Sequence, residues 1–415
     1  MPQHSDSQVD TPSVATEQRL SPDLSPRARP VAAVHRFQNV SICHLLSSSR
    51  RVYDDRAFYR QAEPASAQSL QVSVVAPHGV WGSKEGVELI PLPRANNRLL
   101  RIVTSQTLIF KALRQRATLY HFHDPELIPV GLLLKILFRK KVVYDAREDY
   151  PAMMLNKVYI PKPLRALLGA ALSRLEALAA RALDGIITAD PFTLRRLARL
   201  GPSKKLVFYN FPSYKTFPPP PRDETKPFDL VYSGGLSERC GSFLLLDAVQ
   251  DLIAQGRTLR LLLIGYFDDE RTKELVERRI RTLGLEGHVE LCGTIPHDEM
   301  ARCLSRARIG VCPLQATAKF LHNIPVKVFE YWACGLPVVA SDLPPIRPFF
   351  RNHELGLLFK PGDARELSEA IGWLLDHPTE ATRMGMRGRR AVVERYNNRQ
   401  EAHKLLSFYQ HILQG

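Results

Sequence analysis

The segment from Asn323 to Asp342 reads N-I-P-V-K-V-F-E-Y-W-A-C-G-L-P-V-V-A-S-D and contains a complete helix–turn–strand unit. Pro325 suits the first turn of a helix, because its missing N–H would have no intrahelical partner there. Gly335 is a typical helix end, and Pro337 prevents the helix from resuming. The apolar residues 338–340 then predict a short buried strand. This stretch therefore indicates one unit of an α/β fold.

The start of this helix is also a candidate site for an anionic ligand. The backbone N–H groups of Val326 and Lys327 lack intrahelical partners there, and together with the positive helix end they favour a diphosphate. Glu330 follows Lys327 by three positions, so both side chains lie on nearly the same helix face. An ordinary α/β unit with a solvated Lys–Glu pair explains the spacing equally well.

Strand and helix patterns alternate on both sides of this unit. In the first half we predict strands over 39–46, 71–76, 118–122, 141–144, 185–188 and 206–209, and helices over 54–62, between 122 and 141, and over 163–183. In the second half we predict strands over 228–232, 259–264, 289–292 and 309–313, and helices over 242–254, 269–283, 297–306, 364–375 and 399–413. This alternation predicts two doubly wound, Rossmann-like α/β domains that face each other across a central cleft, with ligands at the carboxyl ends of the strands.

Composition shifts mark the domain boundaries. Ser, Pro, Gln, Asp and Arg dominate the first 37 residues without apolar periodicity, which predicts disorder, and prolines cluster near residue 218, which predicts a linker. The predicted organisation is a disordered N-terminal tail over 1–37, a first domain over 38–212, a Pro-rich linker over 213–226, a second domain over 227–395 and a C-terminal helix within 396–415.

The chain has 415 residues, 45% of them apolar and 24% charged, as in a soluble globular protein. Its net charge of +15 is uneven: residues 1–215 carry +14 (31 Lys and Arg against 17 Asp and Glu), and residues 216–415 carry +1 (26 against 25). We find no zinc-finger spacing, RNP-type aromatic motif or basic region with heptads, so no nucleic-acid partner is expected. The basic half instead predicts contact with an anionic membrane surface.

Three stretches bear on membrane contact. The apolar run Leu127–Phe138 has 12 residues with a lysine inside, too few to span a bilayer. Residues 99–116 and 163–181 are basic and amphipathic, as in helices that lie in a lipid interface; for the second, packing on a sheet with solvated arginines is the favoured alternative. The N-terminus shows no secretory signal, and the six cysteines are scattered without metal-binding spacing. We therefore expect a cytoplasmic protein, peripheral at the inner face of the cell membrane.

Several polar residues follow predicted strands of the first half. His123 stands just after the strand 118–122, where a histidine can contact a sugar hydroxyl or a reacting group near neutral pH; a packed loop histidine is the alternative. Asp124 is next to it. Asp55 ends the loop after the first strand, and Glu148 belongs to an acidic loop after another strand; we expect both to line the cleft.

Glycines follow the strands of the second half. Gly234 and Gly235 end the strand that begins at residue 228, and glycines there let a phosphate or sugar approach the backbone, although a plain turn is also consistent with them. Arg239 follows on the same loop, where a guanidinium can hold a diphosphate. Gly265 and Thr294 stand in the loops after the next two strands, where backbone groups can hold a flat base.

Taken together, five motifs resemble the retaining glycosyltransferases of family 4 (group 1), which have the GT-B fold. These motifs are H-x-H-D-P-E-L from residue 121, V-V-Y-D-A-R-E-D-Y-P from residue 142, V-Y-S-G-G-L-S from residue 231, G-T-I-P from residue 293 and P-V-K-V-F-E-Y-W-A-C-G-L-P-V-V-A-S-D from residue 325. They cover the chain from about Asn39 to its end in consistent order.

The resemblance implies a nucleotide-sugar donor held by the second domain and an acceptor held by the first. Glu330 would bind the ribose hydroxyls, and Lys327 and Val326 the diphosphate. Gly234 and Gly235 would admit the diphosphate and sugar, and the loops at Gly265 and Thr294 would hold the base. The catalytic residues would be His123, at the donor sugar, with Arg239 and Lys327; the acceptor-side residues would be Asp55, Asp124 and Glu148. The family also implies that helix 399–413 crosses back to the first domain.

Two positions depart from the family pattern. Many members carry a glutamate eight positions before the ribose-binding one, where this chain has His322. A Lys or Arg commonly precedes the glycine that opens the helix after G-G-L-S, where this chain has Cys240 before Gly241. These departures affect the donor sugar and the diphosphate.

The leading hypothesis is a peripheral-membrane glycosyltransferase that moves a sugar, with retention, from a nucleotide sugar to a lipid-linked or surface-glycan acceptor. We expect no cofactor and no metal, because cationic side chains and amides can stabilise the leaving diphosphate. A GT-B-fold sugar-nucleotide epimerase or hydrolase, and a catalytically weak GT-B subunit of a partner enzyme, are the alternatives.

Overall fold

The computed structural model describes residues 39–47, 54–77, 81–93, 108–155, 160–201, 203–213, 216–217, 226–350 and 354–414. The predicted tail over 1–37, most of the predicted linker and part of the stretch 99–116 lie outside the described residues. Residues 33–415 belong to one compact unit. The exact boundaries of the two predicted domains within it stay a prediction.

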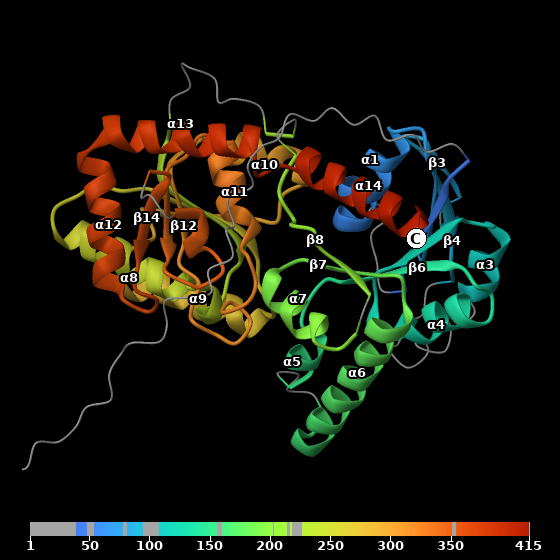
Figure 1. Ribbon diagram of the computed structural model, residues 1–415. Helices are drawn as coiled ribbons and strands as arrows, with labels where there is room; N and C mark the ends of the chain where they lie inside the picture. Colours follow the sequence, from blue (N-terminus) through green and yellow to red (C-terminus); the bar gives the residue numbers. More distant parts are fainter. Residues whose placement is uncertain are drawn as a thin grey trace, which may run out of the picture. The chain divides into compact units, whose positions relative to one another are not determined.

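The first half of the chain builds an eight-stranded sheet, in the order β3-β4-β2-β1-β5-β6-β7-β8 (Figure 1). Its strands are β1 (Ser41–Leu45), β2 (Gln71–Ala76), β3 (Gly82–Lys84), β4 (Val87–Pro91), β5 (Leu119–Phe122), β6 (Lys141–Ala146), β7 (Gly185–Thr188) and β8 (Lys204–Val207). All neighbours are parallel except β3 and β4, which form an antiparallel pair. Buried β-branched and aromatic residues fill the central strands, as expected for a sheet covered on both faces.

Helices connect these strands. They are η1 (Asp55–Ala62), which is a π-helix, α1 (Glu63–Ser66), α3 (Leu108–Arg114), the short η2 (Pro125–Leu127), α4 (Ile128–Ile136), α5 (Tyr150–Leu155), α6 (Lys162–Ala182) and α7 (Pro191–Ala198). Asp54 caps η1 by accepting hydrogen bonds from the N–H groups of Arg56 and Ala57. Asp190 caps α7 in the same way. Both caps are aspartates at strand-to-helix turns, the position where they are most favourable.

The second half builds a six-stranded parallel sheet, in the order β11-β10-β9-β12-β13-β14. Its strands are β9 (Phe228–Gly235), β10 (Leu261–Tyr266), β11 (Val289–Gly293), β12 (Ala307–Cys312), β13 (Val338–Ser341) and β14 (Gly356–Phe359). Its helices are η3 (Glu238–Cys240), α8 (Ser242–Ala254), α9 (Glu270–Thr282), α10 (His297–Ser305), α11 (Val326–Ala333), η4 (Arg347–Phe350), α12 (Ala364–Asp376) and α13 (Pro378–Glu394). Figure 1 shows helices on both sides of this sheet. Two Rossmann-like α/β halves are therefore present, which confirms the predicted fold class.

The last helix, α14 (Asn398–Gln414), packs on the first sheet although it follows the second in sequence. Leu405, Phe408 and Tyr409 join the apolar cluster that contains Ile42 and Phe58. Lys204 of β8 donates a hydrogen bond to the carbonyl of His411. The chain end thus belongs to the core of the first half.

Several elements were not predicted from the sequence: the β3–β4 pair, α5, α7, β14 and α13. Helix α13 contains two glycines at contacts with α11 and its C-terminal turn: a Cβ at Gly385 would lie 2.0 Å from the carbonyl oxygen of Gly335, and one at Gly388 would lie 2.4 Å from the ring of Trp332. Glycine weakens a helical pattern in sequence, yet here it permits close packing. Among the described residues, no helix has the length and hydropathy needed to cross a membrane.

Candidate functional site

The carboxyl ends of β9 and β10 meet the start of α11. Gly234 has a left-handed φ of 127°, and a Cβ there would lie 2.7 Å from Nζ of Lys327. Gly265 pairs with Gly234 across the sheet, and a Cβ on Gly265 would lie 1.7 Å from the Gly234 carbonyl oxygen. Both positions therefore require glycine, and they leave the backbone open beside a lysine.

Lys327 is the second residue of α11, and its Nζ lies 3.8 Å from the ring centroid of Tyr232. Burial lowers the pKa of Lys327, although the neighbouring Cys312, Cys240 and Glu330 oppose this shift. No side chain caps the start of α11, where Pro325 is the N-cap. The ammonium group of Lys327, at the uncapped start of α11, thus forms an electropositive corner beside Gly234.

The remaining predicted donor residues lie in η3, just after β11 and on α11. Arg239 is half-exposed in η3, and its Nη2 donates a 2.8 Å hydrogen bond to Oδ2 of Asp268. Its guanidinium is therefore held by a carboxylate. Thr294 is exposed just after β11. Glu330 lies one turn after Lys327 in α11 and is half-buried.

The two departures from the family pattern have defined surroundings. Cys240 is buried, and its Sγ would lie 3.7 Å from a Cβ on Gly235. His322 is exposed, and its ring centroid lies 5.3 Å from that of Phe192 in α7. His322 thus meets the first half of the chain.

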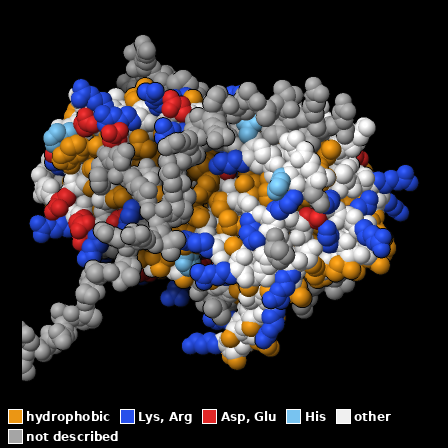
Figure 2. Space-filling view, in the orientation of Figure 1, with side chains coloured by type: hydrophobic (Ala, Val, Ile, Leu, Met, Phe, Trp, Pro, Cys, Tyr) orange, Lys and Arg blue, Asp and Glu red, His pale blue; other side chains and the backbone are white. Residues whose placement is uncertain are grey.

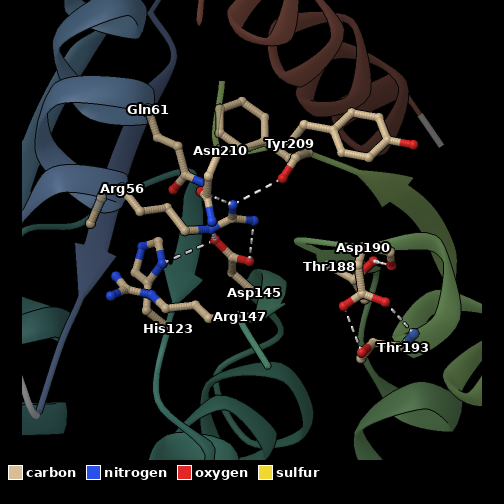
Figure 3. Close-up of polar contacts among 12 residues, drawn as sticks. Arg56, Gln61, His123, Asp145, Arg147, Thr188, Asp190, Thr193, Tyr209 and Asn210 are labelled. Carbon is tan, nitrogen blue, oxygen red and sulfur yellow. Dashed lines mark hydrogen bonds and ion pairs between the residues drawn. The ribbon is translucent and has the colours of Figure 1, made fainter. Parts of the chain in front are cut away.

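His123 belongs to a buried polar network at the end of β5 (Figure 3). Its Nδ1 lies 3.2 Å from Oδ2 of Asp145, and its Nε2 lies 3.0 Å from Nδ1 of His44. Asp145 also accepts two 2.8 Å hydrogen bonds from Arg56 and one of 2.9 Å from Gln61. In Figure 3 the side chains of Arg56, His123 and Asp145 point toward one another from η1, from the loop directly after β5, and from β6.

Charges within the network are compensated. Burial lowers the pKa of His123 and outweighs the opposing effect of Asp145, so the ring is neutral near pH 7. Burial would raise the pKa of Asp145, but Arg56 and His123 hold it well below its usual range. Asp145 is therefore an anion that orients His123. The ring of His123 has no exposed surface, so its predicted contact with a donor sugar stays a prediction.

A single set of described residues could hold a metal ion: His44, His121 and His123 each offer a ring nitrogen, and these lie within 4.8 Å of one another. Such ligands suit zinc and related ions. Each ring also has a partner of another kind, since His44 and His123 pair with each other and Nδ1 of His121 lies 2.6 Å from the hydroxyl of Tyr409. We interpret the set as a hydrogen-bonded core.

The three predicted acceptor-side residues lie in different places in the structure. Glu148 lines a cleft of about 90 Å³ together with Val326 and Asn323 of the second half. Asp124 is buried, and its Oδ2 accepts a 2.7 Å hydrogen bond from the N–H of Ser47. Asp55 lines a different cavity of about 830 Å³ beside α14, and its carboxylate bonds to Arg60. Only Glu148 is placed beside the start of α11.

Three polar residues of this cleft were missed from the sequence. Arg147, Asp190 and Asn210 line it opposite Val326. Arg147 makes two 3.0 Å hydrogen bonds to Asp54, and these align its guanidinium. Its position directly after β6, like that of Asp190 after β7, was the available signal, since ligands collect at strand carboxyl ends.

Residues 214–391 match the family described as Glycosyl transferases group 1. Among curated proteins, the chain is 31% identical over 147 residues to "Amylovoran biosynthesis glycosyltransferase AmsK" of Erwinia amylovora, a match that covers 35% of each chain. It is 28% identical over 172 residues to "Phosphatidyl-myo-inositol mannosyltransferase" of Mycobacterium leprae, covering 41% of this chain and 43% of that protein. The chain thus matches less than half the length of these relatives.

The fold extends the likeness to the first half. "Sucrose-phosphate synthase (tll1590) from Thermosynechococcus elongatus" superposes with a TM-score of 0.72 at 20% identity, covering 90% of this chain and 99% of that one. "Crystal structure of Anabaena Alr3699/HepE in complex with UDP" gives a TM-score of 0.65 at 15% identity, covering 90% and 100%. Structures this distant in sequence establish the fold alone, and that fold is GT-B.

Proposed function

We propose that this chain, with the GT-B fold and a segment of the group 1 glycosyltransferase family over residues 214–391, transfers a sugar from a nucleotide-sugar donor to a lipid-linked or surface-glycan acceptor. One observation carries the proposal. Lys327 Nζ and the uncapped start of α11 converge on the glycine-lined end of β9, where a Cβ at Gly234 would lie 2.7 Å from the ammonium. A diphosphate matches this combination of backbone access and positive charge.

In this proposal the second half binds the donor. Lys327 and the N–H of Val326 hold the diphosphate, and Glu330 accepts hydrogen bonds from the ribose hydroxyls. The base lies between the loops at Gly265 and Thr294. Donors of this kind occur among structures of the same fold, one of which is titled "Crystal structure of Anabaena Alr3699/HepE in complex with UDP-glucose".

The proposed transfer retains the configuration of the sugar and stabilises the leaving diphosphate by Lys327 and the amides of α11, without a metal. His123, oriented by Asp145, contacts the donor sugar once the cleft has opened to admit it. Arg239 is the weaker catalytic candidate, because Asp268 already binds its guanidinium. Glu148 and Arg147 face the incoming acceptor in the cleft lined by Val326. Asp124 and Asp55 stay candidates for the acceptor side, because both follow strands of the first half.

We propose an anionic membrane surface as the place where the acceptor is met, on the cytoplasmic side. The net charge of +14 in residues 1–215 supports it. The names of relatives support a glycan or glycolipid acceptor: one is a "Putative colanic acid biosynthesis glycosyltransferase WcaL" of Salmonella typhimurium, matched over 45% of this chain.

The test is to incubate the purified protein with UDP-, GDP- and ADP-sugars, with and without membrane extract. Transfer of labelled sugar to an extractable lipid or glycan supports the proposal. Turnover of the nucleotide sugar alone indicates an epimerase or hydrolase. Binding without turnover indicates a catalytically weak subunit, and Cys240 and His322 would then be the first positions to restore to the family pattern.

A further inference from the structure

Helix α6 exposes four of its six leucines to solvent, while Leu175 packs against the core of the first half. The residues that it buries are small, apart from one glutamate: Gly169, Glu176, Ala179 and Ala180. Its exposed large apolar residues are all leucines: Leu164, Leu167, Leu168 and Leu178. Leu167 is 61% exposed. A helix that only packs on a sheet buries its large apolar residues, so this inverted arrangement marks an interaction surface.

These four leucines, called here the leucine face, lie on one side of α6. Leu167, Leu168 and Leu178 follow Leu164 by 3, 4 and 14 positions. At 3.6 residues per turn, these spacings place all four within about 100° of the helix circumference. Arg174 is exposed on the same helix. An apolar stripe flanked by basic residues is the pattern of a helix that lies in a lipid interface.

The sequence on either side of the leucine face is basic. Residues 150–175 contain Lys157, Lys162, Arg165 and Arg174 and no Asp or Glu. The nearest carboxylate along α6, that of Glu176, is buried and pairs with Arg196. Along the chain, the charged residues next to the leucine face are therefore basic.

Helix α4, which contacts α6, repeats this composition. Exposed apolar residues of α4 and its C-cap follow helical spacing: Leu133, Ile136 and Leu137. Ile136 is 69% exposed. Residues 127–144 contain four Lys and Arg and no Asp or Glu; two of the four, Lys135 and Lys141, pair with Asp184. Figure 2 shows hydrophobic side chains over α6 and α4 along the lower right of the view, with Lys and Arg beside them.

We propose that the leucine face of α6, together with the exposed end of α4, docks onto a bilayer that contains anionic lipids. The proposal rests on the proposed function, because it names the surface through which the acceptor-bearing membrane is met. Leucines would enter the acyl boundary while the flanking Lys and Arg bind headgroup phosphates. A second copy of this chain fits less well, since a two-fold interface would set like charges against each other.

The experiment measures co-sedimentation of the full chain with phosphatidylcholine vesicles, with and without phosphatidylglycerol. We expect binding that requires phosphatidylglycerol and falls with added salt. The double variant Leu167→Ser, Leu168→Ser should bind at least about tenfold more weakly, because two apolar side chains that would enter the bilayer are lost. Leu275→Ser with Leu291→Ser, which are exposed leucines of the second half, is the matched control and should stay within about twofold of the parent.

Charge is tested with a second pair of variants. Arg174→Glu should reduce vesicle binding and its salt dependence, whereas Arg278→Glu, an exposed arginine of α9, should change neither. Equal binding of parent and leucine-face variants, or no binding of the parent to any vesicle, would overturn the proposal. Self-association without lipid that the leucine variants abolish would also overturn it and assign the face to a second copy.

Nucleotide-sugar binding is measured on the same samples by calorimetry. The leucine-face variants should keep the parent's nucleotide affinity, since α6 contributes none of the donor residues. A parent protein that binds vesicles but no nucleotide sugar would count against the proposed function and leave the docking surface standing. A parent protein that binds nucleotide sugar but no vesicle would overturn the docking surface and leave the proposed function standing.

Discussion

Lys327 and Gly234 stand 93 positions apart, yet the lysine ammonium fills the space that a side chain at Gly234 would need. The two residues act together: Gly234 leaves the backbone accessible, and Lys327 supplies positive charge beside it. Glu330, on the next turn of α11, completes the proposed grip on ribose and diphosphate. The nucleotide site thus depends on a few side chains whose removal can be tested one at a time.

Glu330→Ala should weaken nucleotide-sugar binding by about 1 to 3 kcal/mol, because charge-assisted hydrogen bonds to the ribose are lost. Isothermal titration calorimetry measures the change. Glu274→Ala, an exposed glutamate of α9, is the control and should leave the affinity unchanged. If the Glu330 variant binds as the parent does, Glu330 is not part of the site.

Three buried histidines should make the protein acid-labile. Burial holds the pKa values of His44, His121 and His123 below the ordinary value of 6.5. Below pH 6.5 the unfolded chain therefore binds protons that the folded chain excludes, so the free energy of unfolding falls as the pH falls. Three such groups give a limiting slope of about 4 kcal/mol per pH unit.

Urea unfolding at a series of pH values between about 5 and 7.5 measures this slope. His44→Asn should reduce the slope by about a third, because one of the three groups no longer titrates. His377→Ala, at an exposed histidine whose ring Nδ1 bonds to the Trp373 carbonyl, is the control. A slope that His44→Asn leaves unchanged would contradict this account of the core.

Helix α13 is held against α11 and its C-terminal turn by contacts that only glycine allows. Glycine inside a helix normally costs about 0.5 to 1 kcal/mol relative to alanine, so glycine-to-alanine changes usually stabilise. Gly385 is an exception, since its Cβ would overlap the carbonyl oxygen of Gly335 at the end of α11. The position of α11, and with it that of Lys327, depends on this contact.

Gly385→Ala should destabilise the protein by about 1 to 3 kcal/mol through overpacking. Gly372→Ala in α12 is the matched control: its Cβ would lie 3.5 Å from the nearest atom, an ordinary contact, so it should be neutral or stabilising. Chemical denaturation of both variants gives the two free energies of unfolding. A Gly385 variant as stable as the Gly372 variant would show that α13 can shift without cost.

Helix α14 ties the chain end to the first sheet after the second sheet is complete. Its Tyr409 is buried, and the hydroxyl lies 2.6 Å from Nδ1 of His121 on β5. Leu405 and Ile412 fill the same apolar cluster. This packing makes the stability of the first half depend on residues at the opposite end of the sequence.

Tyr409→Phe should therefore lower the free energy of unfolding by about 1 to 2 kcal/mol, because a buried histidine nitrogen loses its partner. Tyr266→Phe is the control, since Tyr266 is exposed. Thermal and urea unfolding of both variants measure the difference. An effect no larger than that of Tyr266→Phe would show that the Tyr409–His121 contact adds nothing to stability.

Much of the architecture could be read from local patterns. Pro325 and Gly335 bracket α11, and the strands predicted over 71–76 and 185–188 coincide with β2 and β7. Helix α13 could not be read in this way, because Gly385 and Gly388 weaken its helical signal and their purpose appears only when α11 lies beside them. The packing of α14 on the first sheet was predicted only through the family resemblance, because the sequence of residues 399–413 does not indicate which sheet they cover.

The sequence by itself determined the alternation of strands and helices, the basic character of residues 1–215, and which glycines and lysine follow or precede those elements. Each of these depends on residues close together in the chain. Only the tertiary structure decided that Asp55 lies beside α14 while Glu148 lies beside α11, that Asp268 holds Arg239, and that four leucines of α6 are exposed. These outcomes depend on which elements become neighbours. Side-chain burial and pairing between distant segments follow from that packing, and the spacing of residues along the chain does not predict it.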